Sequence, residues 1–242
     1  MQRAMARDTL AVLALTGSEN VLDVGCGDGV LTSSIAARVP SGFVVGVDPA
    51  QGMLSAARSI AEGGESEPVF VRADVRQLPF LRHFDVVVSF NALHWVPQQQ
   101  QALAQIAAVV CPGGQVLIQL VCAGTRTSLE EVAMELTTSP RWARRFSGFE
   151  APFVHVDPQW FAQMASAAGF TVTLLTVDER DWDFGSREGF EDWCAAGLRA
   201  WTDRLPADDR RRFVAELVRD YERVCGRPAV VMFTQMRAEL RR

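Results

Sequence analysis

Three alternating glycines preceded by an aspartate have the clearest chemical meaning in this sequence. The stretch DVGCGDG places Asp23, Gly25, Gly27 and Gly29 at the end of a short apolar run, VLDV. Glycine is required where the chain turns with a positive φ, or where a ligand presses against the backbone. The motif therefore predicts a loop between a strand and a helix that holds a nucleoside-bearing ligand.

A second acid, Asp48, ends the next apolar run, GFVVGVD, 19 residues after Gly29. At the carboxyl edge of a second parallel strand, a carboxylate can accept hydrogen bonds from both hydroxyls of a ribose. The alternative role, a helix N-cap, explains the residue type but not its position after a strand. The acid and the glycine loop together predict a nucleoside site.

The spacing of the glycines separates two kinds of nucleoside cofactor. A dinucleotide fingerprint has another glycine three residues after Gly27, where this chain has Val30. Asp28 would also repel a pyrophosphate at the start of the following helix. We therefore expect S-adenosylmethionine, a sulfonium nucleoside without phosphate, whose cationic amino group Asp23 can meet directly or through water.

Further residues near the ends of the predicted strands extend this cofactor site. Met53 can cover the adenine or fill the core, and Asp74 can accept from the adenine amino group or serve a turn. The set expected to line the cofactor at these strand ends is Asp23, Gly25, Cys26, Gly27, Asp48, Pro49, Met53, Asp74 and Val75. No metal ligand set is expected.

The fourth predicted strand ends in SFNALHWV, beside the glycine loop at the point where a doubly wound sheet reverses its strand order. His94 is the candidate catalytic and substrate-binding residue: a general base, a hydrogen-bond donor to a carboxylate, or a structural histidine. Trp95 is either a wall of the substrate site or a plug beneath the adenine.

A stretch beyond residue 122, RWARRFSGF, combines arginines and aromatic residues. Arginine binds carboxylates with two parallel hydrogen bonds, although charged runs are often only solvated surface. We expect Trp142, Arg144, Arg145 and Phe149 to contact the substrate, in a largely apolar pocket.

Composition excludes several other functions. All 24 basic residues are arginine, so a Walker phosphate loop, a Schiff base and a pyridoxal phosphate site are ruled out, because each needs a lysine. A net charge of −5 argues against a nucleic-acid partner. Five widely spaced cysteines fit free thiols, and with no apolar leader or membrane span we expect a cytoplasmic enzyme, as a monomer or homodimer.

The alternation of apolar runs and helical periodicity predicts the fold. After a lead-in helix over 3–15, strands are expected at 21–25, 42–48, 68–74, 84–90 and 114–121, with helices at 30–39, 51–60 and 99–110. The remainder has strands at 170–177 and 230–240 and helices at 186–199 and 207–224. We expect an α/β, doubly wound, Rossmann-like sheet of seven mostly parallel strands with an antiparallel last strand. One domain, 1–242, would comprise a cofactor-binding half, 1–122, and a second half, 123–242, with the last strands and a helical lid.

The segments VLDVGCGDG, GVDPAQGML, ADVRQLPF, FDVVVSFNALHWV and PGGQVLI resemble the class I S-adenosylmethionine-dependent methyltransferases over residues 1–122. SPRWARRFSGFEAPF and REGFEDWCAAGLRAWTDRLPADDRRRFV are similar to the trans-aconitate methyltransferase-like group, which extends the resemblance to nearly the whole chain. The resemblance implies carboxyl O-methylation of a small acid, with Asn91 at the cofactor and His94 and Trp95 at the substrate. Many relatives close the pocket with an N-terminal tyrosine, whereas the only tyrosine here is Tyr221.

We therefore expect methyl transfer to a carboxylate or hydroxyl oxygen of a small, mostly apolar metabolite of secondary metabolism, leaving S-adenosylhomocysteine. Transfer to nitrogen or carbon is the alternative, against which SFNA in place of an NPPY motif counts. A member that binds the cofactor without transferring methyl is a third possibility, and a nicotinamide oxidoreductase is disfavoured by the glycine spacing.

Overall fold

The computed structural model describes residues 11–62, 67–81 and 83–242, and they form two compact units. The first, which we call the sheet unit, contains residues up to Cys122 together with His155–Val177 and Met236–Arg242. The second, the helical unit, contains Ala123–Val154 and Asp178–Gln235. The chain thus returns twice to the sheet unit after Cys122, so the halves expected on either side of this residue correspond only in part to the two units.

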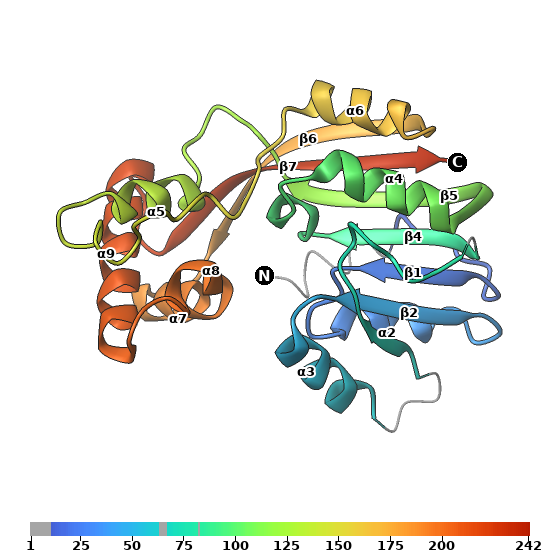
Figure 1. Ribbon diagram of the computed structural model, residues 1–242, viewed down its shortest axis with the longest axis horizontal. Coiled ribbons are helices and arrows are strands. Elements are labelled where there is room, and N and C mark those ends of the chain that lie inside the picture. The colour runs from blue at the N-terminus through green and yellow to red at the C-terminus, as the bar shows by residue number, and fades with distance from the viewer. Residues whose placement is uncertain (1–10, 63–66, 82) are drawn as a thin grey trace. The chain divides into compact units, whose positions relative to one another are not determined.

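A seven-stranded sheet in the order β3-β2-β1-β4-β5-β7-β6 confirms the predicted fold class (Figure 1). The strands are β1 (Asn20–Val24), β2 (Phe43–Asp48), β3 (Val69–Arg72), β4 (Phe84–Phe90), β5 (Val110–Val121), β6 (Thr171–Asp183) and β7 (Val230–Arg241). The central strand β1 pairs in parallel with both β2 and β4. The start of β5 instead meets the end of β7, since Gly113 N–H donates to the Arg242 carbonyl and Arg242 N–H to that of Gly114. This pairing makes β7 antiparallel.

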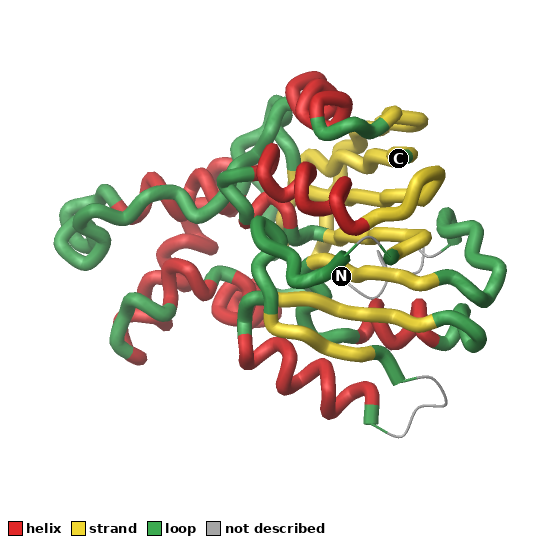
Figure 2. The backbone as a smooth tube through the Cα atoms, turned by 45° about the vertical axis from the view of Figure 1, so that its right-hand side comes forward, coloured by secondary structure: helices red, strands yellow, loops and turns green. Residues whose placement is uncertain are grey.

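Helices cover both faces of the sheet (Figure 2). Apolar side chains of the strands point alternately to the two faces. Leu22 packs toward the face covered by α4 (Gln99–Val109) and α6 (Pro158–Ala167). Its neighbour Val21 packs on the opposite face with Ile35 of α2 (Val30–Ala36). The helix α3 (Gln51–Ala61) packs Leu54 against Phe70 of β3. Burial on both faces explains why these strands are nearly continuous apolar runs.

The lead-in helix predicted over 3–15 lies mostly outside the described residues. Its last part, 11–15, forms a turn and irregular chain, so the helix prediction is wrong there. Leu13 is nevertheless buried, as its apolar character suggests. Its carbonyl accepts hydrogen bonds from the Arg38 side chain and from Leu15 N–H, in place of a helical hydrogen bond.

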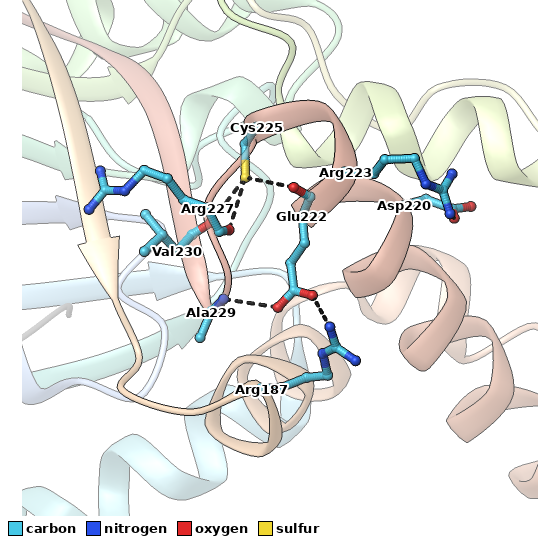
Figure 3. Close-up of polar contacts among 8 residues, drawn as sticks. All are labelled: Arg187, Asp220, Glu222, Arg223, Cys225, Arg227, Ala229 and Val230. Atoms are coloured by element: carbon cyan, nitrogen blue, oxygen red, sulfur yellow. Dashed lines mark hydrogen bonds and ion pairs between the residues drawn. The ribbon is translucent and has the colours of Figure 1, made fainter.

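The helical unit is built from α5 (Leu129–Thr137), α7 (Arg187–Gly197), the short α8 (Arg199–Thr202) and α9 (Ala207–Cys225). Gly226 ends α9 in the left-handed conformation, with φ of 70°. The carboxylate of Glu222, whose side chain is only 8% exposed, accepts a 2.9 Å hydrogen bond from Ala229 N–H and pairs with Arg187 (Figure 3). Glu222 thereby ties the end of α9 to α7 and to the approach to β7. None of the helices described is long and apolar enough to cross a membrane.

Candidate active site

The glycine loop follows β1 and has the backbone conformation that its residues predict. Gly25, Gly27 and Gly29 have φ values of 75°, 55° and 75°. A Cβ on Gly25 would lie 2.2 Å from the Cβ of Ala92, whereas a Cβ on Gly27 would have no atom of the described structure within 4 Å. Gly25 is therefore needed for packing, and Gly27 leaves open space beside the backbone, which a bound ligand can fill.

Asp48, at the end of β2, holds the loop in place. Its Oδ2 accepts a 3.1 Å hydrogen bond from Gly27 N–H, and its Oδ1 accepts a 2.8 Å hydrogen bond from Ala50 N–H. Each carboxylate oxygen can accept further hydrogen bonds. The ribose role predicted for Asp48 is therefore compatible with its structural role in the loop.

Asp23 lies beneath the loop and is only 2% exposed. Its Oδ2 accepts a 2.7 Å hydrogen bond from the hydroxyl of Thr32, which is fully buried on α2. Burial raises the pKa of Asp23 to about 7; the Thr32 hydrogen bond opposes the rise and the charge of Asp48 adds to it. A cationic group next to Asp23 would favour its ionised form. The site thus suits the cationic amino group of S-adenosylmethionine.

The carboxylate of Asp74 is already bound by a neighbouring arginine. Arg76 donates to both of its oxygens, at 2.6 to 3.1 Å, and these hydrogen bonds hold the pKa of Asp74 below its usual value. An adenine amino group would share this carboxylate with Arg76. Val75, next in the chain, is buried in the core of the sheet unit.

Four other predicted cofactor residues differ in their surroundings. Cys26 packs among Leu54 and other residues of one core cluster, and burial, followed by the charges of Asp23 and Asp48, raises the pKa of its thiol. Met53 is half-buried and Pro49 is exposed. Asn91 has a positive φ of 51°, and its N–H donates to the Gln119 carbonyl at 2.7 Å. Asparagine tolerates this conformation better than most residues.

His94 lies in a 3₁₀ turn, η1 (Leu93–Trp95), directly after β4. It is 3% exposed, and its ring lies 5.0 Å from that of Trp95, which is half-buried. Burial, and then the charge of His155, lowers the pKa of His94 to about 3. At neutral pH the ring is therefore an uncharged imidazole with one donor and one acceptor nitrogen.

The predicted substrate residues of the second half lie in the helical unit. Trp142 is buried, with its indole N–H donating to Glu216 at 2.7 Å, and Arg145 pairs with Asp209 at 3.0 Å. Phe149 is half-buried and packs against Trp201, with the guanidinium of Arg204 4.6 Å from its ring centre. Arg144 is exposed and has no ion-pair partner among residues 11–62, 67–81 and 83–242. Their contact with a substrate stays a prediction.

Three residues important to this geometry do not appear in the sequence prediction: Thr32, Arg76 and His155. Thr32 shares the buried face of α2 with Ile35 and Ala36, so helical periodicity could have placed its hydroxyl toward the sheet. The described residues contain no cluster of three or more histidine, cysteine, aspartate or glutamate side chains suited to a metal ion.

The sequence is similar to proteins named as methyltransferases. Residues 21–114 match a family model described as a methyltransferase domain. Trans-aconitate 2-methyltransferase of Methylobacterium nodulans is 28% identical over 229 residues, covering 87% of this chain and 80% of that protein. The putative methyltransferase 235L of Invertebrate iridescent virus 6 is 24% identical over 220 residues, covering 91% and 80%.

Solved structures show the same fold. A putative methyltransferase from Bacillus halodurans has a TM-score of 0.69 and 20% identity, covering 98% of each chain. The [4+2]-cyclase SpnF has a TM-score of 0.66 and 20% identity, covering 99% of this chain and 80% of that one. The fold is therefore shared with proteins whose names give different activities.

Proposed function

We propose that this chain, which is a class I S-adenosylmethionine-dependent methyltransferase, transfers the methyl group to an oxygen of a small, mostly apolar metabolite. The observation that carries the choice of oxygen is the similarity, along most of the chain, to enzymes named for trans-aconitate. That molecule is a carboxylic acid. The sequence SFNA at the end of β4 (residues 89–92), in place of NPPY, supports the same choice.

The fit of the cofactor rests on the open space at Gly27 and on two acids, one buried beneath the loop and one at its edge. We assign the amino group to Asp23, the ribose to Asp48, and the adenine to Asp74, Val75 and Met53, with Asn91 beside the loop. When bound, S-adenosylmethionine supplies a methyl group on a positively charged sulfur, with a good leaving group. The protein's main task is then to hold the acceptor oxygen close to that methyl and in line with it.

His94 is assigned to the acceptor as a positioning group rather than a base. A carboxylate, with a usual pKa near 4, needs no base at neutral pH, whereas a phenol near 10 does. Because burial depresses the pKa of His94 to about 3, its imidazole is a weak proton acceptor but can still donate a hydrogen bond to an oxygen. These properties support an ionised acceptor over one that must be deprotonated.

Arg144 is assigned to recognition of an acidic substrate, since its guanidinium has no ion-pair partner in the described part of the helical unit, whereas Arg145 is paired with Asp209. Phe149 would supply apolar surface within the helical unit, and Trp95 would supply it beside His94 within the sheet unit. Arg144→Leu should raise KM for a carboxylic acid and leave kcat nearly unchanged. Arg211→Leu, which removes another exposed arginine of the helical unit, one that pairs with Asp208, serves as the control. Equal effects of the two changes would remove Arg144 from the substrate site.

The test is a panel of carboxylic acids, phenols and amines, including trans-aconitate, incubated with S-adenosylmethionine and followed by mass spectrometry of methylated products. We expect methylated acids, with methyl groups released by mild alkali because they are esters. Methylation of amines but not of acids or phenols would overturn the choice of oxygen. Cofactor binding without any transfer would instead indicate a member that does not methylate.

A further inference from the structure

The Nδ1 atom of His94 is an unusual feature of the sheet unit. It is buried and has no hydrogen-bond partner in the described part of the chain. Leaving a buried polar atom unpaired destabilises the fold, so such an atom in a native fold requires an explanation. A ligand atom placed at this nitrogen would supply the missing hydrogen bond.

A second histidine lies beside it. The ring of His155 is 6.2 Å from that of His94, centre to centre, with the two planes at 50°. The residues are 61 positions apart in the sequence, and the third histidine of the chain, His83, packs instead against Phe43. The fold therefore brings two of the three imidazoles together at the carboxyl end of β4.

The backbone on both sides of this pair is fixed by the sheet unit itself. Leu93, before His94, and Val156, after His155, belong to the same hydrophobic core. Asp157 then caps α6, accepting hydrogen bonds from the N–H groups of Gln159 and Trp160 at 2.9 and 3.0 Å. The spacing of the two rings is thus set by packed residues.

The spacing suits an oxygen ligand. A hydrogen bond to oxygen spans about 2.7–3.0 Å, so one oxygen can join two ring nitrogens that are up to roughly 6 Å apart. Two rings whose centres are 6.2 Å apart can place a nitrogen of each within that range. A carboxylate, with two oxygens, can bridge a similar or larger gap. The neutral imidazole of His94 offers one donor and one acceptor nitrogen, and an imidazole in either protonation state has at least one N–H. Both rings can therefore donate a hydrogen bond to an oxygen of a carboxylate or a hydroxyl.

We propose that His155 is a second acceptor-binding residue, which together with His94 holds the oxygen-bearing group of the methyl acceptor between the two imidazoles. This inference rests on the proposed function, because it assigns the ligand of the pair as the acceptor. His155 then contributes to the alignment of the attacking oxygen, not to the binding of the cofactor.

The experiment uses the full chain saturated with S-adenosylhomocysteine, with the imidazole nitrogens labelled with ¹⁵N. The probes are acetate, for a carboxylate acceptor, and phenol, for a hydroxyl acceptor. We expect one of them to shift the ring nitrogens of His94 and His155 but not those of His83. His155→Phe should abolish the response of His94, and His83→Gln, the matched control, should preserve it.

Calorimetry separates failure of this inference from failure of the proposed function. His155→Phe should bind S-adenosylhomocysteine within about twofold of the unmodified chain, which also shows that it folds. With an acceptor from the panel, it should lose roughly 10²-fold in kcat/KM, as expected for a misplaced reacting group, with His155→Gln partly restoring the loss. The assignment would be overturned if the His94 ring nitrogens shifted equally in the unmodified chain and in His155→Phe. It would also be overturned if neither acetate nor phenol shifted the ring nitrogens of His94 or His155.

Discussion

Replacing Thr32 with valine tests how the buried acid beneath the glycine loop is kept ready for the cofactor. The change removes the hydroxyl that donates to Asp23 at 2.7 Å and keeps nearly the same shape. A hydrogen bond to a charged group is worth about 1.5–3 kcal/mol. Since about 1.4 kcal/mol corresponds to one pKa unit, Thr32→Val should raise the pKa of Asp23 by about one to two units above its value of about 7.

The consequence for binding follows from the ionised fraction of Asp23. At pH 7 about half of the unmodified protein has an ionised Asp23 before the cofactor binds, against roughly 1–10% of the variant. If the ionised form binds the cofactor's amino group, the Kd for S-adenosylhomocysteine should rise about 5- to 50-fold. The ratio of the Kd of Thr32→Val to the Kd of the unmodified chain should be larger at pH 6 and smaller at pH 8. The reason is that Asp23 loses its proton at a lower pH in the unmodified chain than in the variant.

Isothermal titration calorimetry at pH 6, 7 and 8 measures these ratios directly. Thr32→Ser keeps the hydroxyl and is the matched control, so its Kd should stay close to that of the unmodified chain. An unchanged Kd for Thr32→Val at pH 7, or a ratio that does not vary with pH, would refute the reasoning about Asp23.

Three further predictions concern the loop, the buried acids and the helical unit. Gly27→Ala and Gly113→Ala both place a Cβ in open space at a positive φ. Each change should therefore lower the free energy of unfolding, measured by thermal unfolding, by about 1–2 kcal/mol. Only Gly27→Ala should also lose cofactor binding in calorimetry. Burial raises the pKa of both Asp23 and Glu130 to about 7, so each acid lends stability below about pH 4 that is lost as the pH rises toward 7. Asp23→Asn and Glu130→Gln should therefore both stabilise the cofactor-free protein at pH 8, by up to about 4 kcal/mol. Only Asp23→Asn should weaken cofactor binding. If both changes destabilised the protein at pH 8, the predicted sign of the effect of these raised pKa values on stability would be wrong. Glu222→Ala should lower the free energy of unfolding in urea by about 1–3 kcal/mol, because it leaves the N–H of Ala229 unpaired, and a change below 0.5 kcal/mol would show that the contact contributes little.

The sheet could be predicted from the sequence because its signal is local. The strand expected at 84–90 is β4, and the expected strands at 42–48 and 230–240 differ from β2 and β7 by a single residue. Runs of apolar residues of this length, separated by helical periodicity, report directly on a sheet buried on both faces. The glycine loop was predictable for a similar reason, since glycine adopts positive φ without the steric cost that other residues pay.

Partners distant in the sequence could not be predicted. Nothing in the spacing indicates that His155 would lie against His94, or that Trp142 would donate to Glu216, 74 residues away. Arg76 is close to Asp74, but two residues along a turn can face each other or diverge, and only the fold decides. Similarly, nothing in the spacing indicates that Arg38 would donate to the carbonyl of Leu13 in the irregular chain at 11–15.

The most direct test of the central claim is the chemical position of the transferred methyl group. S-adenosylmethionine labelled with ¹³C in its methyl group should be incubated with the purified chain and the acceptor panel, and the ¹³C chemical shift of the product methyl recorded. We predict a methyl carbon bound to oxygen, in a product that forms together with S-adenosylhomocysteine. A methyl carbon bound to nitrogen or carbon, or cofactor that binds but is never consumed, would contradict the account.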